Sequence, residues 1–380
     1  MTSWPSMGRG PLRRARQSED VVRCSLSVVR ARAGRRTNNE QRTTPETDGR
    51  PTMSEKSYRD AIREAMMEEM DRDEKVLIMG EDIGVYEGTF RITAGMLKKY
   101  GPRRVIDTPI AEAGMVGTAV GMAMVGLRPI VEMMTVNFAI VAADQILNHA
   151  AKVRYFSGGQ VDVPMVIRGP QGAGVQLSAQ HSQSFESFYA HFPGLHVVAP
   201  ATPADAKGLL KTAIRGRDPV MFLESAALYG MKGEVPDDRD FTVPFGQSRV
   251  AREGSDVTIV SFSRMLQLSL VVADKLAADE GIECEVIDLR TLRPLDLDPV
   301  YESVAKTHRA VVVQEQWKPF GAGAEIAASI TEQMFDDLDA PVARVTGEDV
   351  PMPYARNLEL LATPHEEHIA RAVKKVMYRS

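Results

Sequence analysis

Short apolar runs alternate with helical stretches along most of the chain, and this alternation restricts the fold more than any other feature of the sequence. In the first half the apolar runs are KVLIMG (75–80), RVIDT (104–108), RPIVEM (128–133), VPMVIRG (163–169), LHVVAP (195–200) and PVMFLE (219–224). Helices are predicted around them, from Ser54 or Ser57 to about Asp71 and at 113–126, 138–154 and 203–215. Strands that are apolar throughout and separated by helices are typical of a parallel sheet with both faces covered.

The alternation resumes after a polar, turn-rich segment at 233–255. Strands are predicted there at 256–262, 283–289, 309–315 and 342–347, and helices at 264–279, 296–306, 322–335 and 365–377. We therefore predict an α/β protein with two parallel-sheet domains, at 53–235 and 255–380, joined by a linker at 236–254.

The first 52 residues differ from the rest in charge and composition. They contain 11 Arg, no Lys and 5 acidic residues, a charge of +6, which leaves about −11 for the remainder of a chain whose net charge is −5. The segment is rich in Thr, Asn, Pro and Gly and has little apolar pattern, so we expect it to be disordered. Three interpretations stay open: a transit peptide, a regulatory tail, or a translation start at Met53.

The composition excludes several classes of function. A negative net charge argues against nucleic acid as the main partner. No apolar run is long enough to predict a membrane span. The two cysteines, Cys24 and Cys284, cannot form a disulfide framework, and no Cys/His spacing indicates a zinc site, so a reducing compartment is expected.

Ligands of such sheets gather at the carboxyl ends of the strands. Three predicted strands end in glycine, proline or a carboxylate, at MGED (79–82), DTPIAEAG (107–114) and GPQGAG (169–174). Each segment alone is explained equally well by an ordinary turn, but together they favour a site. The chain has no G-x-S-x-G elbow, no Walker loop, and no G-x-G-x-x-G opening a helix after the first strand.

Four side chains near these strand ends are candidate site residues. Glu112 is expected in the first turn of a helix, either as a simple helix-start acid or as a partly desolvated carboxylate that shares a proton with a ligand nitrogen. Glu81 is a loop acid or a second carboxylate of the same site. His181 is a structural loop histidine unless its loop reaches the cleft, and Phe138 packs either in the core or on a flat ligand.

Several long segments of the sequence resemble one known family, the beta subunits of the thiamin-diphosphate-dependent component of 2-oxo acid dehydrogenase complexes. The likeness is greatest to the pyruvate dehydrogenase (acetyl-transferring) members and covers about residues 55–378. It is carried by GEDIG, RVIDTPIAEAGMVGTAVGMAMVGLRPIVEMM, NFAIVAADQILNHAAK, SGGQVDVPMVIRGPQGAG, AQHSQSFESFYAHFPGLHVVAP and VTGEDVPMPYA. The resemblance implies a transketolase-like pyrimidine-binding domain followed by a transketolase C-terminal domain.

The resemblance also implies roles for individual residues. Glu112 matches the glutamate that hydrogen-bonds the cofactor's aminopyrimidine and holds a proton against its ring nitrogen. Glu81 matches a cofactor-side glutamate, Phe138 an aromatic residue on the pyrimidine, and His181 a histidine that donates a proton during transfer to a lipoyl group. A potassium site is implied at Met165, Ala213, Ile214, Gly216 and Asp218, where some relatives carry Asp in place of Gly216.

The chain lacks the G-D-G segment with which thiamin enzymes of this type anchor diphosphate and Mg²⁺. The resemblance assigns that half of the site to an alpha subunit, in an alpha2-beta2 heterotetramer that serves a lipoyl acyltransferase. The Gly- and Ala-rich helix predicted at 113–126 is a candidate for close packing at such an interface. A bacterial cytoplasmic location is expected, or the mitochondrial matrix if residues 1–52 are a transit peptide.

The leading hypothesis is therefore the beta subunit of pyruvate dehydrogenase, which decarboxylates pyruvate and transfers the acetyl unit to a lipoyl group. The runner-up is a beta subunit acting on branched-chain 2-oxo acids or acetoin. A self-sufficient transketolase-like enzyme is disfavoured by the missing G-D-G segment. A non-catalytic docking subunit is disfavoured by the presence of Glu81, Glu112, Phe138 and His181 together.

Overall fold

The computed structural model describes residues 52–379, so the predicted disordered extension at 1–52 lies outside the described residues except for Thr52. The first domain is built on a seven-stranded sheet. Its strands are β2 (Val76–Gly80), β3 (Val105–Asp107), β4 (Arg128–Glu132), β5 (Val166–Gln171), β6 (His196–Val198), β7 (Val220–Ser225) and β12 (Thr291–Arg293). The order across the sheet is β12-β6-β7-β5-β4-β2-β3, and every neighbouring pair is parallel except β12 with β6.

Helices cover both faces of this sheet. They are α1 (Tyr58–Arg72), α2 (Met96–Tyr100), α3 (Glu112–Met124), η1 (Val136–Ala142), η2 (Gln145–Ala150), α4 (Ala151–Phe156), α5 (Glu186–Ala190), α6 (Pro203–Arg215) and η3 (Ala226–Leu228). Ser57, one of the two predicted caps, begins α1, and its hydroxyl accepts a hydrogen bond of 3.1 Å from the amide of Asp60. The helix predicted at 138–154 is instead split into a 3₁₀ turn, a π turn and a short α-helix.

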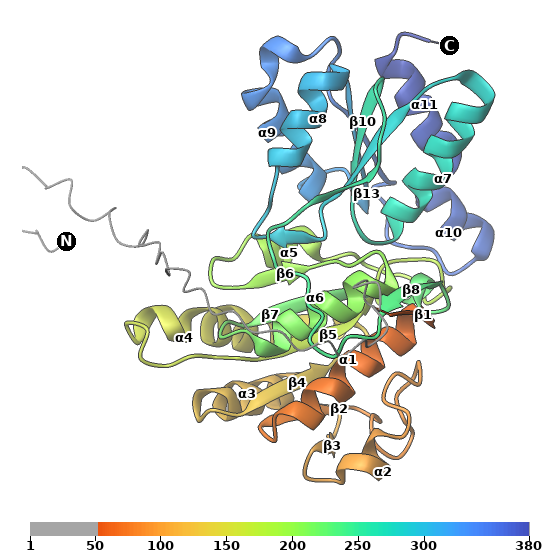
Figure 1. Ribbon diagram of the computed structural model, residues 1–380. Coiled ribbons are helices and arrows are strands. Elements are labelled where there is room, and N and C mark those ends of the chain that lie inside the picture. Colours follow the sequence, from red (N-terminus) through yellow and green to blue (C-terminus); the bar gives the residue numbers. More distant parts are fainter. Residues whose placement is uncertain (1–51, 380) are drawn as a thin grey trace, which may run out of the picture. The chain divides into compact units, whose positions relative to one another are not determined.

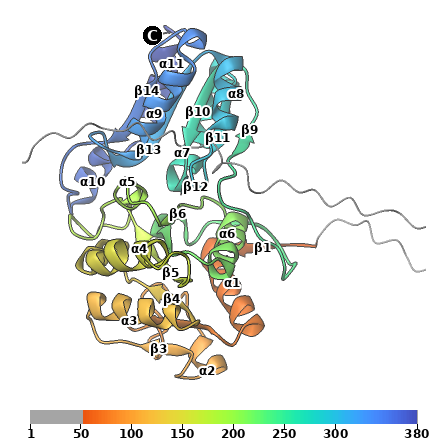
Figure 2. The ribbon, with the colours of Figure 1, turned by 90° about the vertical axis from the view of Figure 1, so that its left-hand side faces the viewer.

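The apolar strands are buried on both faces, as expected for a parallel sheet. Successive residues alternate between the two sides. Ile78 and Ile130 pack with α1 and α6, whereas Met79 and Val131 pack with α3, η1 and η2. Figure 2 shows α1 and α6 on the face of the sheet opposite to α3 and α4. The prediction of a doubly covered sheet is therefore confirmed.

The second domain repeats this architecture. Its strands are β9 (Arg249–Arg252), β10 (Val257–Ser261), β11 (Cys284–Asp288), β13 (Ala310–Trp317) and β14 (Ala343–Gly347), in the order β14-β13-β10-β11-β9. Its helices are α7 (Ser263–Glu280), α8 (Asp298–Thr307), α9 (Ala322–Gln333), η4 (Phe335–Asp337), α10 (Arg356–Ala362) and α11 (Glu366–Val376). Figure 1 shows α8 and α9 on one face of the sheet and α7 and α11 on the other.

Three antiparallel pairings were not predicted. Strand β1 (Met53–Ser57) pairs with β8 (Lys232–Pro236), and β9, inside the expected linker, pairs with β11. Strand β12 follows β11 in the chain but joins the sheet of the first domain. The apolar core beside α3 also continues into residues of β10, β11, α8 and α9. The chain therefore crosses between the sheets more often than the sequence pattern indicates.

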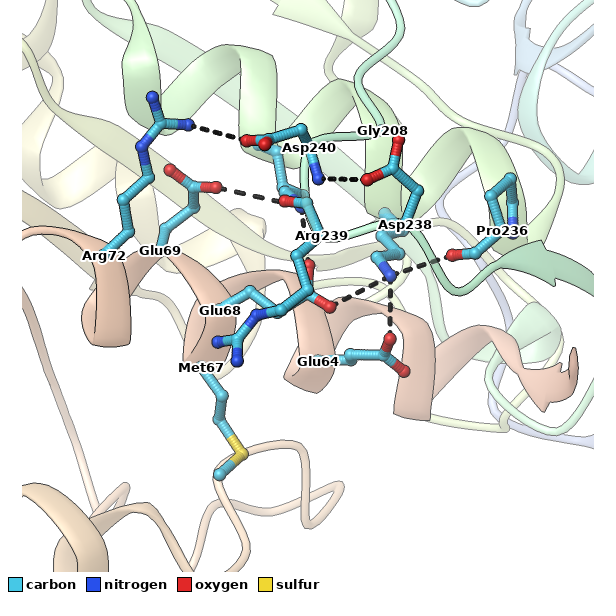
Figure 3. A network of polar contacts seen from close by, with 12 residues as sticks. Glu64, Met67, Glu68, Glu69, Arg72, Gly208, Pro236, Asp238, Arg239 and Asp240 are labelled. Atoms are coloured by element: carbon cyan, nitrogen blue, oxygen red, sulfur yellow. Dashed lines mark hydrogen bonds and ion pairs between the residues drawn. The ribbon is translucent and has the colours of Figure 1, made fainter. Parts of the chain in front are cut away.

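An ion-pair ladder joins α1 to α6 and fixes the segment that follows β8 (Figure 3). Its pairs are Lys207 with Glu64 at 2.7 Å, Lys211 with Glu68 at 2.6 Å, and Arg215 with Glu69 at 2.7 Å. Both lysines are fully buried, and their Nζ atoms also donate to the carbonyl oxygens of Pro236 and Arg239. The four-residue spacing of the three bases places them on one face of α6. Within residues 52–379, no helix is both long and apolar enough to cross a membrane.

Candidate active site

The four predicted site residues follow four neighbouring strands of the first sheet. Along the sheet, the strands run in the order β5, β4, β2 and β3. His181 follows β5, Phe138 follows β4, Glu81 follows β2, and Glu112 follows β3. Because these strands are parallel, all four residues lie at one edge of the sheet, spread over roughly 15 Å at the usual strand spacing.

Glu81 and Glu112 are both buried carboxylates, with 7% and 9% of their surface exposed. Glu112 is the first residue of α3, as the sequence predicts, where the helix dipole favours a negative charge. Burial raises the pKa of Glu81, and the nearby negative charges of Glu112 and Asp82 raise it further. The Oε1 atom of Glu81 has no hydrogen-bond partner among the described residues. An unpaired buried carboxylate oxygen of this kind suits a ligand that brings its own hydrogen-bond donor.

Phe138 and His181 meet in a small apolar cavity of about 130 Å³. Their ring centroids are 5.0 Å apart and the rings meet edge to face. The loop bearing His181 therefore reaches Phe138 at the strand ends, but the residues lining this cavity do not include Glu81 or Glu112. The other lining residues come from the end of β5, the start of η3 and the loops after β2, β4 and β5: Thr89, Phe90, Met134, Thr135, Pro170, Gln171, Gly172, Val175, Leu177 and Ala226.

A buried charged triad lies beneath this edge, and sequence reasoning missed it. Arg168 on β5 is fully buried and donates to Glu224 on β7 from Nε and Nη2, each at 2.5 Å. Its Nη1 atom donates to Glu132 at the end of β4. The hydroxyl of Tyr229 also donates to Glu224, at 2.7 Å. Glu132 and Arg168 are register partners on adjacent strands, so the pairing follows from the strand alignment.

The site can be tested for its fit to the cofactor that the family resemblance implies. The strand ends offer two neighbouring buried carboxylates, one with an unpaired oxygen, and an apolar cavity with an aromatic wall, although neither carboxylate lines that cavity. These features fit the flat, polar-edged pyrimidine half of thiamin diphosphate. No cluster of three or more His, Cys, Asp or Glu side chains suited to a metal occurs within residues 52–379.

Two domain models match the chain: "Transketolase, pyrimidine binding domain" over residues 54–232 and "Transketolase, C-terminal domain" over residues 246–369. A Rickettsia felis protein named pyruvate dehydrogenase E1 component subunit beta is 54% identical over 324 residues, which are 85% of this chain and 99% of that protein. This chain belongs to the family of pyruvate dehydrogenase E1 beta subunits.

Other members of the E1 beta family are similarly close. The Arabidopsis thaliana mitochondrial subunit beta-1 is 53% identical over 86% of this chain and 90% of its own length. A solved structure described as a split-gene transketolase, inactive beta4 tetramer, matches with a TM-score of 0.69 at 24% identity, over 85% of this chain and 98% of that one. This structural likeness supports the fold of two mainly parallel α/β domains, and the predicted fold class and family are confirmed.

Of the five positions at which the resemblance implies a potassium site, three lie beside two arginines, Arg128 and Arg154. Arg128 Nη1 donates to the carbonyl oxygens of Ile214 at 2.8 Å and of Gly216 at 2.7 Å. The carboxylate of Asp218 is paired with Arg154 at 2.6 Å. Three of the five expected ion ligands are thus already bound to a cationic guanidinium, and the geometry fits these groups better than a further cation. The other two carbonyls, those of Met165 and Ala213, accept main-chain amides.

The three residues of the buried triad, which sequence reasoning did not identify, share one property. Arg168, Glu132 and Glu224 are scattered through apolar strands, and only the strand register brings them together. A charged residue inside an otherwise apolar run, as in VIRG and FLES, is the only local signal that could have marked them. Buried charges are rare unless they are paired, so each such residue implies a partner on a neighbouring strand.

Proposed function

We propose that this chain is the beta subunit of a pyruvate dehydrogenase E1 component, which decarboxylates pyruvate and transfers the acetyl unit to the lipoyl group of an acyltransferase. The observation that carries the proposal is the 54% identity, over nearly the whole length of the relative, to a subunit of that name. The four candidate side chains at one sheet edge support it.

Glu81, Glu112 and Phe138 would hold the pyrimidine half of thiamin diphosphate. The cofactor, when bound, supplies the electron sink for decarboxylation. Glu112 would hold a proton against the pyrimidine ring nitrogen, from its buried position at the start of α3 near Glu81. The unpaired Oε1 of Glu81 is available to accept a hydrogen bond from the same ligand. Phe138 excludes water and offers a flat contact surface.

His181 is the proposed proton donor during transfer of the acetyl unit to the lipoyl group. It lies on a loop that also lines the cavity with Val175 and Leu177, so it can meet a group that enters from outside. A histidine is suited to this step because its unperturbed pKa lies near neutral pH. We expect a variant with Ala at position 181 to retain decarboxylation with an artificial electron acceptor and to lose most lipoyl transfer.

The diphosphate and Mg²⁺ would be held by an alpha subunit, in an alpha2-beta2 heterotetramer. The exposed face of α3 supports this partner, because all of its exposed residues except Met124 are small and allow close packing: Ala113, Gly114, Thr118 and Gly121. Large apolar side chains are exposed beside it on elements that cover the same face of the sheet: Val141 is 64% exposed, Tyr155 88% and Phe156 68%. Exposed apolar surface of this extent is typical of an interface.

The direct test uses the chain co-expressed with its cognate alpha subunit. Glu112→Gln is expected to lower pyruvate decarboxylation by about 10²-fold or more, because positioned acid–base groups contribute 10²–10⁴-fold. Glu302→Gln, an exposed glutamate on α8, is the matched control and should leave the rate unchanged. Full activity of the Glu112 variant would refute the proposed mechanism. A substrate panel that prefers branched-chain 2-oxo acids or acetoin would move the assignment to the runner-up.

Two further proposals accompany this function. The location is the bacterial cytoplasm, or the mitochondrial matrix if residues 1–52 act as a transit peptide; named relatives occur in Rickettsia and in plant mitochondria. The second proposal is a potassium site, and the geometry favours it least of all the proposed features. Its ligands would come from Met165, Ala213, Ile214, Gly216 and Asp218. A higher melting temperature in KCl than in choline chloride of equal ionic strength would support it, and equal temperatures would contradict it.

A further inference from the structure

The loop that carries His181 has an irregular backbone. It begins at Gly172, directly after β5, and is closed by a 3.0 Å bond from the amide of Gly172 to the carbonyl of Gln183. Four of its residues have positive φ angles: Gly172 at +80°, Gly174 at +106°, Gln176 at +57° and Ser178 at +67°. Positive φ is unfavourable for the two non-glycine residues, so contacts outside the loop must maintain this conformation.

Those contacts come from the second domain. Glu359 on α10 uses one oxygen, Oε1, to accept hydrogen bonds from the amides of Gly174 at 3.0 Å and Gln176 at 3.1 Å. Glu315 on β13 accepts a hydrogen bond from the amide of Ala173. The buried carboxylate of Glu359 and the partly buried carboxylate of Glu315 thus bind three nearly consecutive main-chain N–H groups at the base of the loop.

Two further contacts strengthen this attachment. Nη1 of Arg264 donates to the carbonyl of Ala173 at 3.2 Å and lies 3.4 Å from Oε2 of Glu315. The side chain of Ala173 packs in a small apolar cluster with Met352 and Ala362 of the second domain. Among the described residues, both the amide and the carbonyl of Ala173 are therefore bound by second-domain side chains.

The backbone of Gly172, the first residue of the loop, lies very close to the carboxylate of Glu315. A Cβ atom at Gly172 would lie 2.5 Å from Oε1 of Glu315 and would displace that carboxylate, and the φ of +80° at this position also favours glycine. Burial raises the pKa of Glu315, whereas the charge of Arg264 and the hydrogen bond from Ala173 lower it. Hydrogen bonds from amides to an ionised carboxylate are stronger than those between neutral groups.

We propose that Glu359 and Glu315 are positioning residues for acetyl transfer, which hold the loop so that His181 faces Phe138 in the cavity. The proposal rests on the proposed function, because the role of His181 is part of that function. In this proposal the second domain acts at the active site, although none of its side chains lines the cavity. The carboxylates act on the loop backbone and not on the reacting groups.

The test combines amide hydrogen exchange with two partial reactions, on the chain paired with its alpha subunit. Glu359→Ala is expected to speed exchange in the peptide spanning 172–183 by about tenfold or more, since the amides of Gly174 and Gln176 lose their acceptor. Acetyl transfer to a lipoyl domain should fall by a similar factor in kcat, with little change in KM for pyruvate. Decarboxylation with an artificial electron acceptor should change by less than about threefold.

Two further variants separate positioning from a general loss of structure. Glu359→Gln keeps an acceptor oxygen and should restore much of the exchange protection and of the transfer rate. Glu348→Ala is the control, because Glu348 is exposed and lies in the same domain. Unchanged exchange in Glu359→Ala, or an equal fall in both partial reactions, would overturn the proposal. The exchange measurement needs no substrate, so its result does not depend on the proposed function. If the wild-type pair does not use pyruvate, the proposed function is refuted instead.

Discussion

Replacing Arg168 by Met tests the buried triad beneath the site. The substitution keeps a long side chain but removes the cation that binds Glu224 twice at 2.5 Å and also binds Glu132. Glu224 is fully buried and Glu132 is 8% exposed, so two carboxylates are left in the sheet without their partner. Removing one member of a buried ion pair destabilises a protein by about 3–5 kcal/mol.

The assay is thermal unfolding at neutral pH, followed by circular dichroism. For a folded unit of roughly 330 residues, an unfolding entropy of about 2.1 cal/mol/K per residue converts this loss into a fall in Tm of ~4–7 °C. The loss should shrink as the pH is lowered, because a carboxylate without its cation takes up a proton when buried. Burial already raises the pKa of Glu132, even though Arg168 opposes that shift.

Two controls make the test specific. Adding Glu132→Gln and Glu224→Gln to the Arg168 variant removes the stranded charges and should recover most of the lost stability. Arg217→Met breaks a 2.8 Å pair with Asp162 in which the Arg side chain is 63% exposed, so it should cost less than about 1 kcal/mol. Equal effects of the Arg168 and Arg217 variants would refute the assignment of a buried, energetically dominant cation.

Two other predictions concern stability. Gly194→Ala should prevent or severely weaken folding, measured as yield and Tm, because the added Cβ would lie 1.9 Å from the carbonyl oxygen of Ala151 at a φ of +101°; an unchanged Tm would contradict this. Glu186→Gln should change the pH dependence of unfolding, because burial raises the pKa of Glu186 to about 8 from an ordinary 4.5. The native carboxyl keeps its proton over this interval while the unfolded one loses it, so wild-type stability contains a contribution that is complete below about pH 4.5 and lost by about pH 8. The free energy of unfolding of Glu186→Gln should therefore rise relative to that of wild type between pH 5 and 8, by on the order of a few kcal/mol. A difference between the two proteins that does not change with pH would show that Glu186 is not buried as described.

Most of the secondary structure could be predicted from the sequence, because apolar strands and amphipathic helices leave local periodic patterns. Helix α6 has both of its predicted ends, Pro203 and Arg215, and the structure shows Thr202 as its cap and a proline in its first turn. The strand-end positions of Glu81 and Glu112 were also predictable, because parallel strands bring their carboxyl ends to one edge. The family followed from long ordered motifs and not from composition.

The two α/β domains, the family and the edge of the sheet at which the candidate residues lie could thus be predicted from the sequence. The contacts between distant segments became visible in the three-dimensional structure. Strand β12 joins the first sheet, and Glu359 reaches across to the amide of Gly174, 185 positions away in sequence. Arg168 likewise finds its carboxylates only through strand register. Periodicity reports which side of an element is buried, whereas these contacts depend on which elements become neighbours, and no local pattern carries that information.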